Sequence, residues 1–297
     1  MAEVMGKDGT WTFDGEVLRI VPGRDRGVHK LRQLLGEVAV PLEAVAGISY
    51  EPGKKGGRLR LRLREGADPF TQAARGRISD AADPYQLAVD ADRTGVAGYL
   101  VDEVRNALVI EQVPDGPASR YLMPGPSVPL TAAGGDGTAT FDGETISLEW
   151  NWSVESAKRS AGPQRITIAD LAAVEWIPAA GLENGYVRFQ VRGVAHRLPP
   201  KHDPHCLVLW GLEKETRTVA MLVAAVTARL PHPSASGAPP ALEPAAPASA
   251  GAGGTGDGPD DHDALLRRLR ELGGLHRDGV LTDEEFALAK QAILRRF

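Results

Sequence analysis

Apolar and polar residues alternate in two distant stretches of the chain. In Gly57–Leu63 three leucines alternate with three arginines, and in Gly185–Val191 apolar residues again fill every second position. Because successive side chains of a strand point to opposite faces, this period of two predicts strands with one buried and one solvated face. Ile146 and Leu148 are followed at the same spacing by Trp150 and Trp152. Both tryptophans are expected to pack in a core or between domains, and the alternative is an aromatic platform for a ligand.

A second pattern follows each strand-rich stretch. Gly98–Ile110 and Val219–Leu230 carry apolar residues at intervals of three and four, which is the period of an amphipathic helix. The chain is therefore expected to contain two copies of one unit, each made of several antiparallel strands and one closing helix. This is a mainly β (α+β) fold class.

Internal sequence repeats support the two copies. The pentapeptide TFDGE occurs at Thr12–Glu16 and at Thr140–Glu144, and four further blocks recur in the same order. One of them pairs VAGISYEP (45–52) with LAAVEWIP (171–178). A matching order of blocks indicates tandem repeats. The Asp-Gly pairs predict a hairpin in each copy, with the type I′ turn that needs positive φ at both central residues.

Composition divides the chain into five parts. Prolines between 114 and 129 mark a linker between the copies, and residues 231–259 are rich in Pro, Ala, Gly and Ser, which favours a flexible tether. The predicted parts are repeat 1 (5–112), a linker (113–133), repeat 2 (134–230), a disordered linker (231–260) and a helical hairpin (261–297).

The hairpin carries its own helix signals. Gly273-Gly274 separates two apolar-periodic segments, and Thr282 with Glu285 three residues later forms a capping box. Two short helices rarely hold a core alone, so their apolar faces are expected to need a partner surface. The residues assigned to oligomerisation or partner docking are Leu265, Leu266, Leu269, Leu272, Phe286, Ala289, Ile293 and Leu294.

Charge and cysteine content narrow the function classes. A net charge of -5 argues against nucleic-acid binding, and the single cysteine, Cys206, fits a reducing compartment. The N-terminus has no signal-peptide pattern and no apolar run approaches the length of a membrane span, so a soluble, cytoplasmic protein is expected.

One cluster of basic residues departs from the acidic average. It could bind an anion or an anionic phospholipid headgroup through charge-assisted hydrogen bonds, or it could be a solvated strand face. The candidate anion-binding residues are Lys54, Lys55, Arg58, Arg60, Arg62 and Arg64.

Metal and catalytic chemistry have weaker signals. His202, His205 and Cys206 are zinc-ligand types, but a structural site needs four ligands. Gly279 and Glu285 fit two positions of a calcium loop whose first ligand positions lack carboxylates. The chain contains no GxSxG or P-loop motif. A protein without cofactor, metal or catalysis is expected.

Two family resemblances follow from these residues. The tandem blocks with their FDG hairpins resemble a family of unknown function (DUF4429-like) over about residues 5–232, which implies two tandem pleckstrin-homology-like (PH-like) β-barrels, each closed by a C-terminal helix, without known catalysis. The tail resembles the SHOCT (short C-terminal) domain over about residues 262–297, which implies an oligomerisation or partner-docking module. The matching residues are Leu265, Leu269, Leu272, Gly279, Thr282, Glu285, Phe286, Lys290 and Leu294.

The leading hypothesis is a non-catalytic cytoplasmic scaffold that oligomerises, or docks a protein partner, through its tail. The alternative hypothesis is a peripheral binder of anionic phospholipid surfaces that uses the basic loops of repeat 1.

Overall fold

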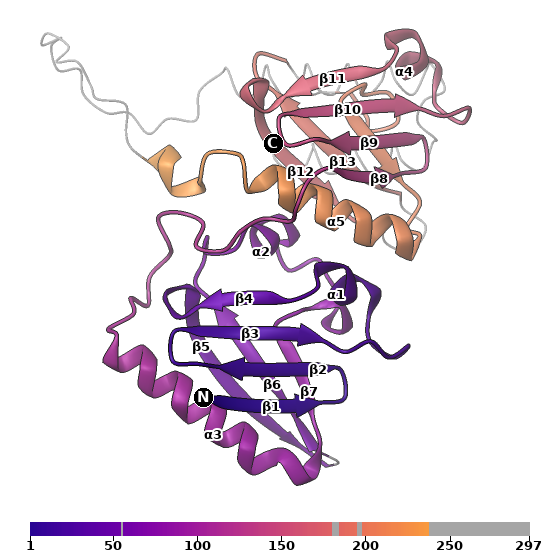
Figure 1. The fold of residues 1–297 in the computed structure, drawn as a ribbon. Helices are drawn as coiled ribbons and strands as arrows, with labels where there is room; N and C mark the ends of the chain where they lie inside the picture. The colour runs from indigo at the N-terminus through magenta and orange to yellow at the C-terminus, as the bar shows by residue number, and fades with distance from the viewer. Residues whose placement is uncertain (55, 180–183, 195–197, 238–297) are drawn as a thin grey trace, which may run out of the picture. The chain divides into compact units, whose positions relative to one another are not determined.

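A computed structural model describes residues 1–54, 56–179, 184–194 and 198–237 (Figure 1). These residues belong to one compact unit, Met1–Pro240. Lys55 and all of the residues assigned to oligomerisation or partner docking lie outside the described ranges, and so does the candidate calcium loop. Among the described residues, no helix is both long and apolar enough to span a bilayer.

The described residues of the first repeat form two antiparallel sheets and three α-helices. One sheet has the order β1-β2-β3-β4 and the other has the order β5-β6-β7. Its elements are β1 (Ala2–Gly6), β2 (Gly9–Phe13), β3 (Val17–Pro22), α1 (Lys30–Leu35), β4 (Val38–Pro41), β5 (Val45–Gly53), β6 (Gly56–Leu63), α2 (Pro69–Ala74), β7 (Gln86–Val89) and α3 (Thr94–Ile110).

The second repeat has the same order of strands. Its sheets are β8-β9-β10-β11 and β12-β13-β14, and the described part of the segment between β13 and β14 contains no counterpart of α2. Its elements are β8 (Leu130–Ala133), β9 (Gly137–Phe141), β10 (Thr145–Trp150), α4 (Ser156–Ala161), β11 (Gln164–Thr167), β12 (Leu171–Ile177), β13 (Gly185–Val191), β14 (Cys206–Leu209) and α5 (Glu213–Thr227).

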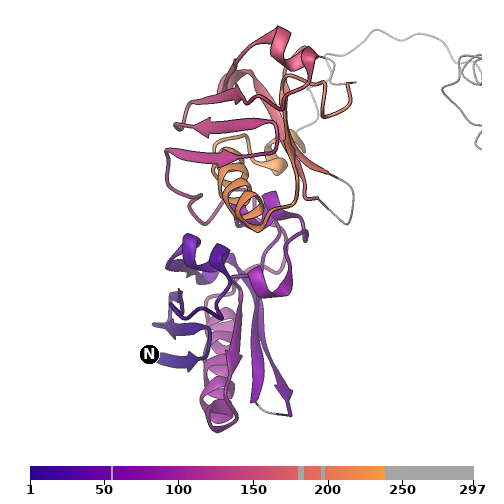
Figure 2. The same cartoon turned by 90° about the vertical axis from the view of Figure 1, so that its right-hand side faces the viewer.

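The predicted mainly β fold class is confirmed, because the described residues form four open antiparallel sheets. In the first repeat the long helix α3 lies between the two sheets and contacts both β1 and β5 (Figure 2). Among the described strands, no pairing joins the two sheets of a repeat into a closed ladder. Closure into barrels therefore stays a prediction.

The alternating pattern correctly predicts the buried face of the sheets. Leu59 and Leu61 of β6 are buried, as are Val187 and Phe189 of β13. The preceding strand carries a bulge at the same place in both repeats, at Val45/Gly47 and at Leu171/Ala173. A bulge bends a strand at one point, so the repeats match in backbone detail as well as in sequence.

The hairpin turns differ from the predicted type. In both turns the Asp side chain accepts hydrogen bonds from two following backbone N–H groups: Asp14 from Glu16 and Val17, and Asp142 from the equivalent residues. Only glycine adopts a positive φ within these fully described turns, 108° at Gly15 and 116° at Gly143. The type I′ prediction was wrong, because a type I′ turn needs a second residue with positive φ. Hydrogen bonds from the backbone to the Asp side chain hold these turns instead.

The two repeats share one hydrophobic cluster. Helix α2 of the first repeat packs on α5 of the second, and Phe70 and Ala73 lie in the same buried cluster as Val219 and Leu222. A hydrogen bond from the Arg77 guanidinium to the Trp176 carbonyl reinforces this contact. Burial of apolar area joins the repeats within one unit.

The segment between the repeats packs back on the first repeat. Ala118 and Met123 are buried, and backbone N–H groups of Ala118 and Leu122 donate to Glu65 and Ala67. Strand β8 begins at Leu130, inside the range predicted as linker. The proline-rich composition therefore marks an irregular segment with fixed hydrogen bonds.

Candidate functional site

A buried lysine–aspartate pair joins the two sheets of the second repeat. Lys158 of α4 is fully buried and donates to Asp136 Oδ2 at 2.5 Å and to the Cys206 carbonyl at 2.6 Å. The other carboxylate oxygen, Asp136 Oδ1, accepts from the Val208 backbone N–H at 2.9 Å. Asp136 lies in the turn between β8 and β9, whereas Cys206 and Val208 lie on β14. One carboxylate and one cation therefore tie the four-stranded sheet to the three-stranded sheet.

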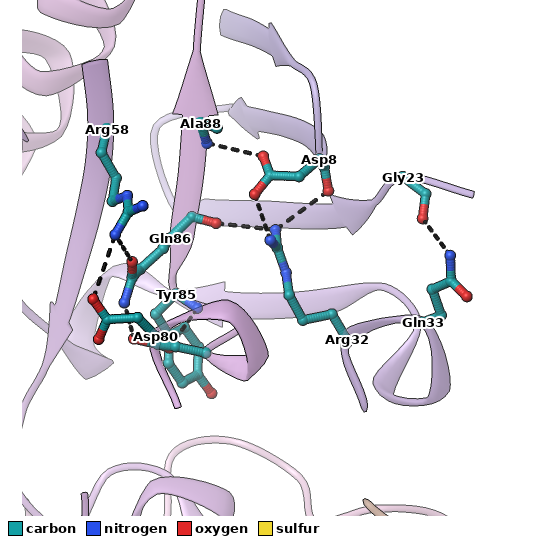
Figure 3. Close-up of polar contacts among 10 residues, drawn as sticks. Asp8, Gly23, Arg32, Gln33, Arg58, Asp80, Tyr85, Gln86 and Ala88 are labelled. Carbon is teal, nitrogen blue, oxygen red and sulfur yellow. Dashed lines mark hydrogen bonds and ion pairs between the residues drawn. The ribbon is translucent and has the colours of Figure 1, made fainter. Parts of the chain in front are cut away.

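The first repeat contains the same arrangement with arginine as the cation (Figure 3). Arg32 of α1 donates to Asp8 Oδ2 at 2.5 Å and to the Gln86 carbonyl at 3.0 Å. Asp8 Oδ1 accepts from the Ala88 backbone N–H at 2.8 Å. Buried charges require a partner. The repeated geometry shows that the pair is part of the fold of each repeat.

These pairs were not predicted from the sequence, although the sequence contains one signal for them. Asp8 and Asp136 begin the Asp-Gly-Thr triplet at the start of the most similar block. An aspartate kept in both copies ahead of a strand indicates a shared structural role. The cations give no such signal, because Arg32 and Lys158 differ in type and lie in dissimilar segments.

In the first repeat the polar contacts continue from this pair to the outer face of the sheet. The Gln86 side-chain amide donates to Asp83 at 2.8 Å, and its oxygen accepts from Arg58 at 3.1 Å. Arg58 also lies 3.4 Å from Asp80 (Figure 3). Arg58, one of the predicted anion-binding residues, is therefore engaged within the protein.

The other members of the basic cluster lie in different settings. Arg60 pairs with Glu51 at 3.1 Å and with Asp80 at 3.4 Å, and these acids raise its pKa through a hydrogen bond and Coulombic attraction. Arg64 donates to the carbonyls of Glu43, Gly116 and Pro117. Arg62 and Lys54 have no polar partner among the described residues. Anion binding by this cluster stays a prediction.

Arg60 and Arg62 line a cavity of about 690 Å³ together with Arg105 of α3. The cavity lies where the edge strand β5 meets the end of α3, and its apolar wall includes Leu61, Leu108 and Val109. Arg105 donates two hydrogen bonds, at 3.2 and 3.1 Å, to the Ile48 carbonyl of that edge strand. Arg60 is paired with Glu51 and Asp80, so Arg62 and Arg105 are the guanidinium groups beside the apolar wall that can bind a negatively charged ligand with apolar parts.

The two tryptophans predicted to lie in a core have different environments. Trp150 is partly buried and donates to the Gly162 carbonyl at 2.8 Å, and the Lys158 ammonium lies 4.9 Å from its ring centre. Trp152 is 88% exposed because β10 ends at Trp150 and the alternation no longer applies beyond it. The core prediction was therefore wrong for Trp152, which lines a second cavity of about 510 Å³ with Trp210.

Cys206 is buried, and burial raises the pKa of its thiol to about 12. The thiolate is the nucleophilic and metal-binding form of cysteine, so this side chain is inert at neutral pH. Within the described ranges, no three or more His, Cys, Asp or Glu residues come together as metal ligands.

The fold and the buried pairs define a protein of two tandem β repeats. The family described as a domain of unknown function (DUF4429) matches residues 11–105 and 139–227, which together make up more than half of the chain. The chain belongs to this family, and the two matched segments are the two repeats. A search of curated proteins gives no match.

Proposed function

We propose that this protein is a non-catalytic cytoplasmic scaffold with two PH-like modules and a C-terminal assembly tail. The repeats and the tail have different functions. The repeats present binding surfaces, and the tail joins copies of the chain or docks a protein partner. In each repeat, the four-stranded sheet, the three-stranded sheet and the closing helix support the PH-like assignment.

This proposal rests on one observation: in both repeats, buried charged side chains connect the two sheets. Asp8 with Arg32, and Asp136 with Lys158, connect the two sheets of their repeats. The second oxygen of each carboxylate accepts a hydrogen bond from a backbone N–H group of the three-stranded sheet. Charges used in this way hold a rigid framework, and a rigid framework suits a protein that presents surfaces to partners.

The tail supplies the assembly function. Its sequence places Leu265 and Leu269 at helical spacing in one predicted helix, and Phe286, Ala289 and Ile293 at helical spacing in the next. A tether rich in Pro, Ala, Gly and Ser allows such a segment to reach a partner without fixing the orientation of the repeats, and it raises the effective concentration of linked sites.

A charge on the apolar face of the tail tests this proposal. Phe286→Asp would place a carboxylate in the assembly interface and should dissociate the full-length protein, because an unpaired buried charge is strongly unfavourable. Gln291→Asp adds the same charge to the same predicted helix away from its apolar face and serves as the matched control. Sedimentation velocity should show a smaller species for Phe286→Asp only. Equal sedimentation of both variants and the parent would reject the assignment.

The second candidate function is binding to an anionic phospholipid surface. It is supported by Arg62, which has no polar partner among the described residues and lines the 690 Å³ cavity. Vesicles of phosphatidylglycerol and phosphatidylcholine should then retain the protein at low salt and release it at high salt, because surface charges are screened. Failure to sediment with such vesicles at low salt would exclude this function.

A further inference from the structure

The two repeats carry equivalent grooves between an edge strand and the end of the closing helix. In the second repeat the groove is lined by Ala172–Val174 of β12 and by Thr227, Leu230 and Pro231 at the end of α5. The repeat blocks align these positions with Ala46–Ile48 of β5 and with Arg105, Leu108 and Val109 of the first repeat. Strands β5 and β12 are both edge strands of their sheets.

In the second repeat this groove is covered by polypeptide. Helix α2 packs beside α5 (Figure 1). Gln72 of α2, with Arg75 and Arg77 of the segment after it, lines the groove. The Arg77 guanidinium donates to the Trp176 carbonyl of the edge strand. The remaining cavity is about 200 Å³. The groove of the second repeat is thus the surface that holds a short helix.

In the first repeat the equivalent groove is open. Its cavity is about 690 Å³, and Val109 beside it is 77% exposed. The described segment between β13 and β14, where the second repeat would need a counterpart of α2, forms no helix. The first repeat therefore has the docking surface without the segment that covers its equivalent.

The chemistry of the open groove differs from that of the covered one in charge. Arg105 replaces Thr227, and Arg62 replaces Gln190 at the equivalent position of the central strand. Arg62 has no polar partner among the described residues. Asp83, the acid in the lining, already accepts from the Tyr85 backbone N–H at 2.9 Å and from the Gln86 amide at 2.8 Å. The groove offers positive charge beside an apolar wall.

We propose that the groove between β5 and the end of α3 is a docking site for a short acidic, helical segment of a partner protein. The covered groove of the second repeat shows that this surface shape accepts a short helix, and the arginines select for acidic side chains. A second copy of the same groove is a poor occupant, because Arg62 and Arg105 would face their own copies. Leu108 and Val109 supply the apolar contact that a helix face needs.

This inference rests on the proposed scaffold function and names the partner surface of the first repeat. Its test is independent of the tail, so a failed test here leaves the sedimentation result of Phe286→Asp unchanged. The probe is a fluorescein-labelled peptide with the sequence of residues 68–79, which contains α2, carrying Arg75→Glu and Arg77→Glu. The unsubstituted, basic peptide is the control probe.

Fluorescence anisotropy with the full-length protein should give a saturable isotherm for the acidic peptide and none for the basic one. The groove of the second repeat is already covered by α2 of the first repeat, so the peptide reports on the open groove. Arg62→Gln combined with Arg105→Gln should weaken binding about tenfold. Arg192→Gln, an exposed arginine of the second repeat, should leave binding unchanged.

Because Arg105 also bonds to the edge strand, Arg62→Gln alone provides a variant that removes no internal hydrogen bond or ion pair among the described residues. It should weaken binding about threefold. Absence of saturable binding, or binding insensitive to Arg62→Gln, would overturn the proposal. Phosphatidylglycerol vesicles form the second arm of the test. If these vesicles bind through Arg62 and the acidic peptide does not, the groove recognises a lipid surface and the polypeptide assignment is rejected.

Discussion

Removal of the buried lysine of the second repeat tests the physical account of how the sheets are joined. Lys158→Met keeps an unbranched side chain, one heavy atom shorter, and deletes its charge. The variant leaves the Asp136 carboxylate, whose side chain is only 10% exposed, without its cation. It also leaves the Cys206 carbonyl without the ammonium donor at 2.6 Å. Breaking one side of a buried ion pair costs about 3–5 kcal/mol.

The expected effect is large enough to measure in two ways. Urea denaturation followed by circular dichroism should show the free energy of unfolding lowered by about 3–5 kcal/mol. For a unit of this size, 1 kcal/mol corresponds to about 2–4 °C, so the melting temperature should fall by roughly 6–20 °C. Arg32→Met in the first repeat should cost less, because the Asp8 side chain is 25% exposed and water can partly replace the lost cation.

The matched control replaces both members of the pair. Lys158→Met combined with Asp136→Leu removes the unpaired charge and should recover much of the lost stability, since apolar replacements of buried ion pairs are often neutral or stabilising. A loss below about 1 kcal/mol for Lys158→Met would refute the reasoning, as that is the range of exposed ion pairs. A double variant as unstable as the single one would show that the charge is not the cause.

Four further predictions follow from individual contacts. Arg77→Ala should lower the free energy of unfolding by about 1–3 kcal/mol in urea, because the Trp176 carbonyl at the repeat interface loses its charged donor. The Cys206 thiol should not react with a disulfide reagent at pH 8 until urea unfolds the protein. Burial raises the pKa of Tyr85 well above 10 and that of Cys206 to about 12, so above about pH 9 the unfolded chain loses protons that the folded one keeps; the free energy of unfolding should therefore fall from pH 9 to 12 in urea titrations. Gly56→Ala should destabilise the protein by more than about 1 kcal/mol by thermal denaturation, since the new Cβ would lie 2.1 Å from a backbone oxygen of β7 at a φ of 127°. Each prediction has an outcome that would contradict it. These outcomes are a stability unchanged by Arg77→Ala or Gly56→Ala, a thiol that reacts in the folded state, and a free energy of unfolding that does not change with pH.

The sequence was sufficient for features that depend on local periodicity. The alternation in Gly57–Leu63 correctly identified a half-buried strand, because side-chain direction depends only on position along the strand. The repeated blocks correctly identified two copies, and the family match falls on the same two segments. Trp152 was misplaced because periodicity does not say where a strand ends.

Features that depend on contacts between distant residues could not be predicted. The buried pairs join residues that are 24 positions apart in the first repeat and 22 in the second, with no spacing rule between them. The basic cluster looked uniform in sequence, yet Arg64 bonds to backbone carbonyls and Arg62 lies free of partners among the described residues. The roles of Arg62 and Arg64 differ because of how the linker and α3 pack around the cluster, and the sequence alone does not show that packing.

The central claim is that the chain assembles through its tail while the repeats form an independent unit. The most direct test is the absolute mass, from light scattering during size exclusion, of the full chain and of a chain ending at Pro240, where the compact unit of the repeats ends. If the tail assembles the chain, the full chain should have a mass that is a multiple of 31.6 kDa and the shorter chain should be a monomer. A monomeric full chain, or a shorter chain that keeps the multimeric state, would contradict it.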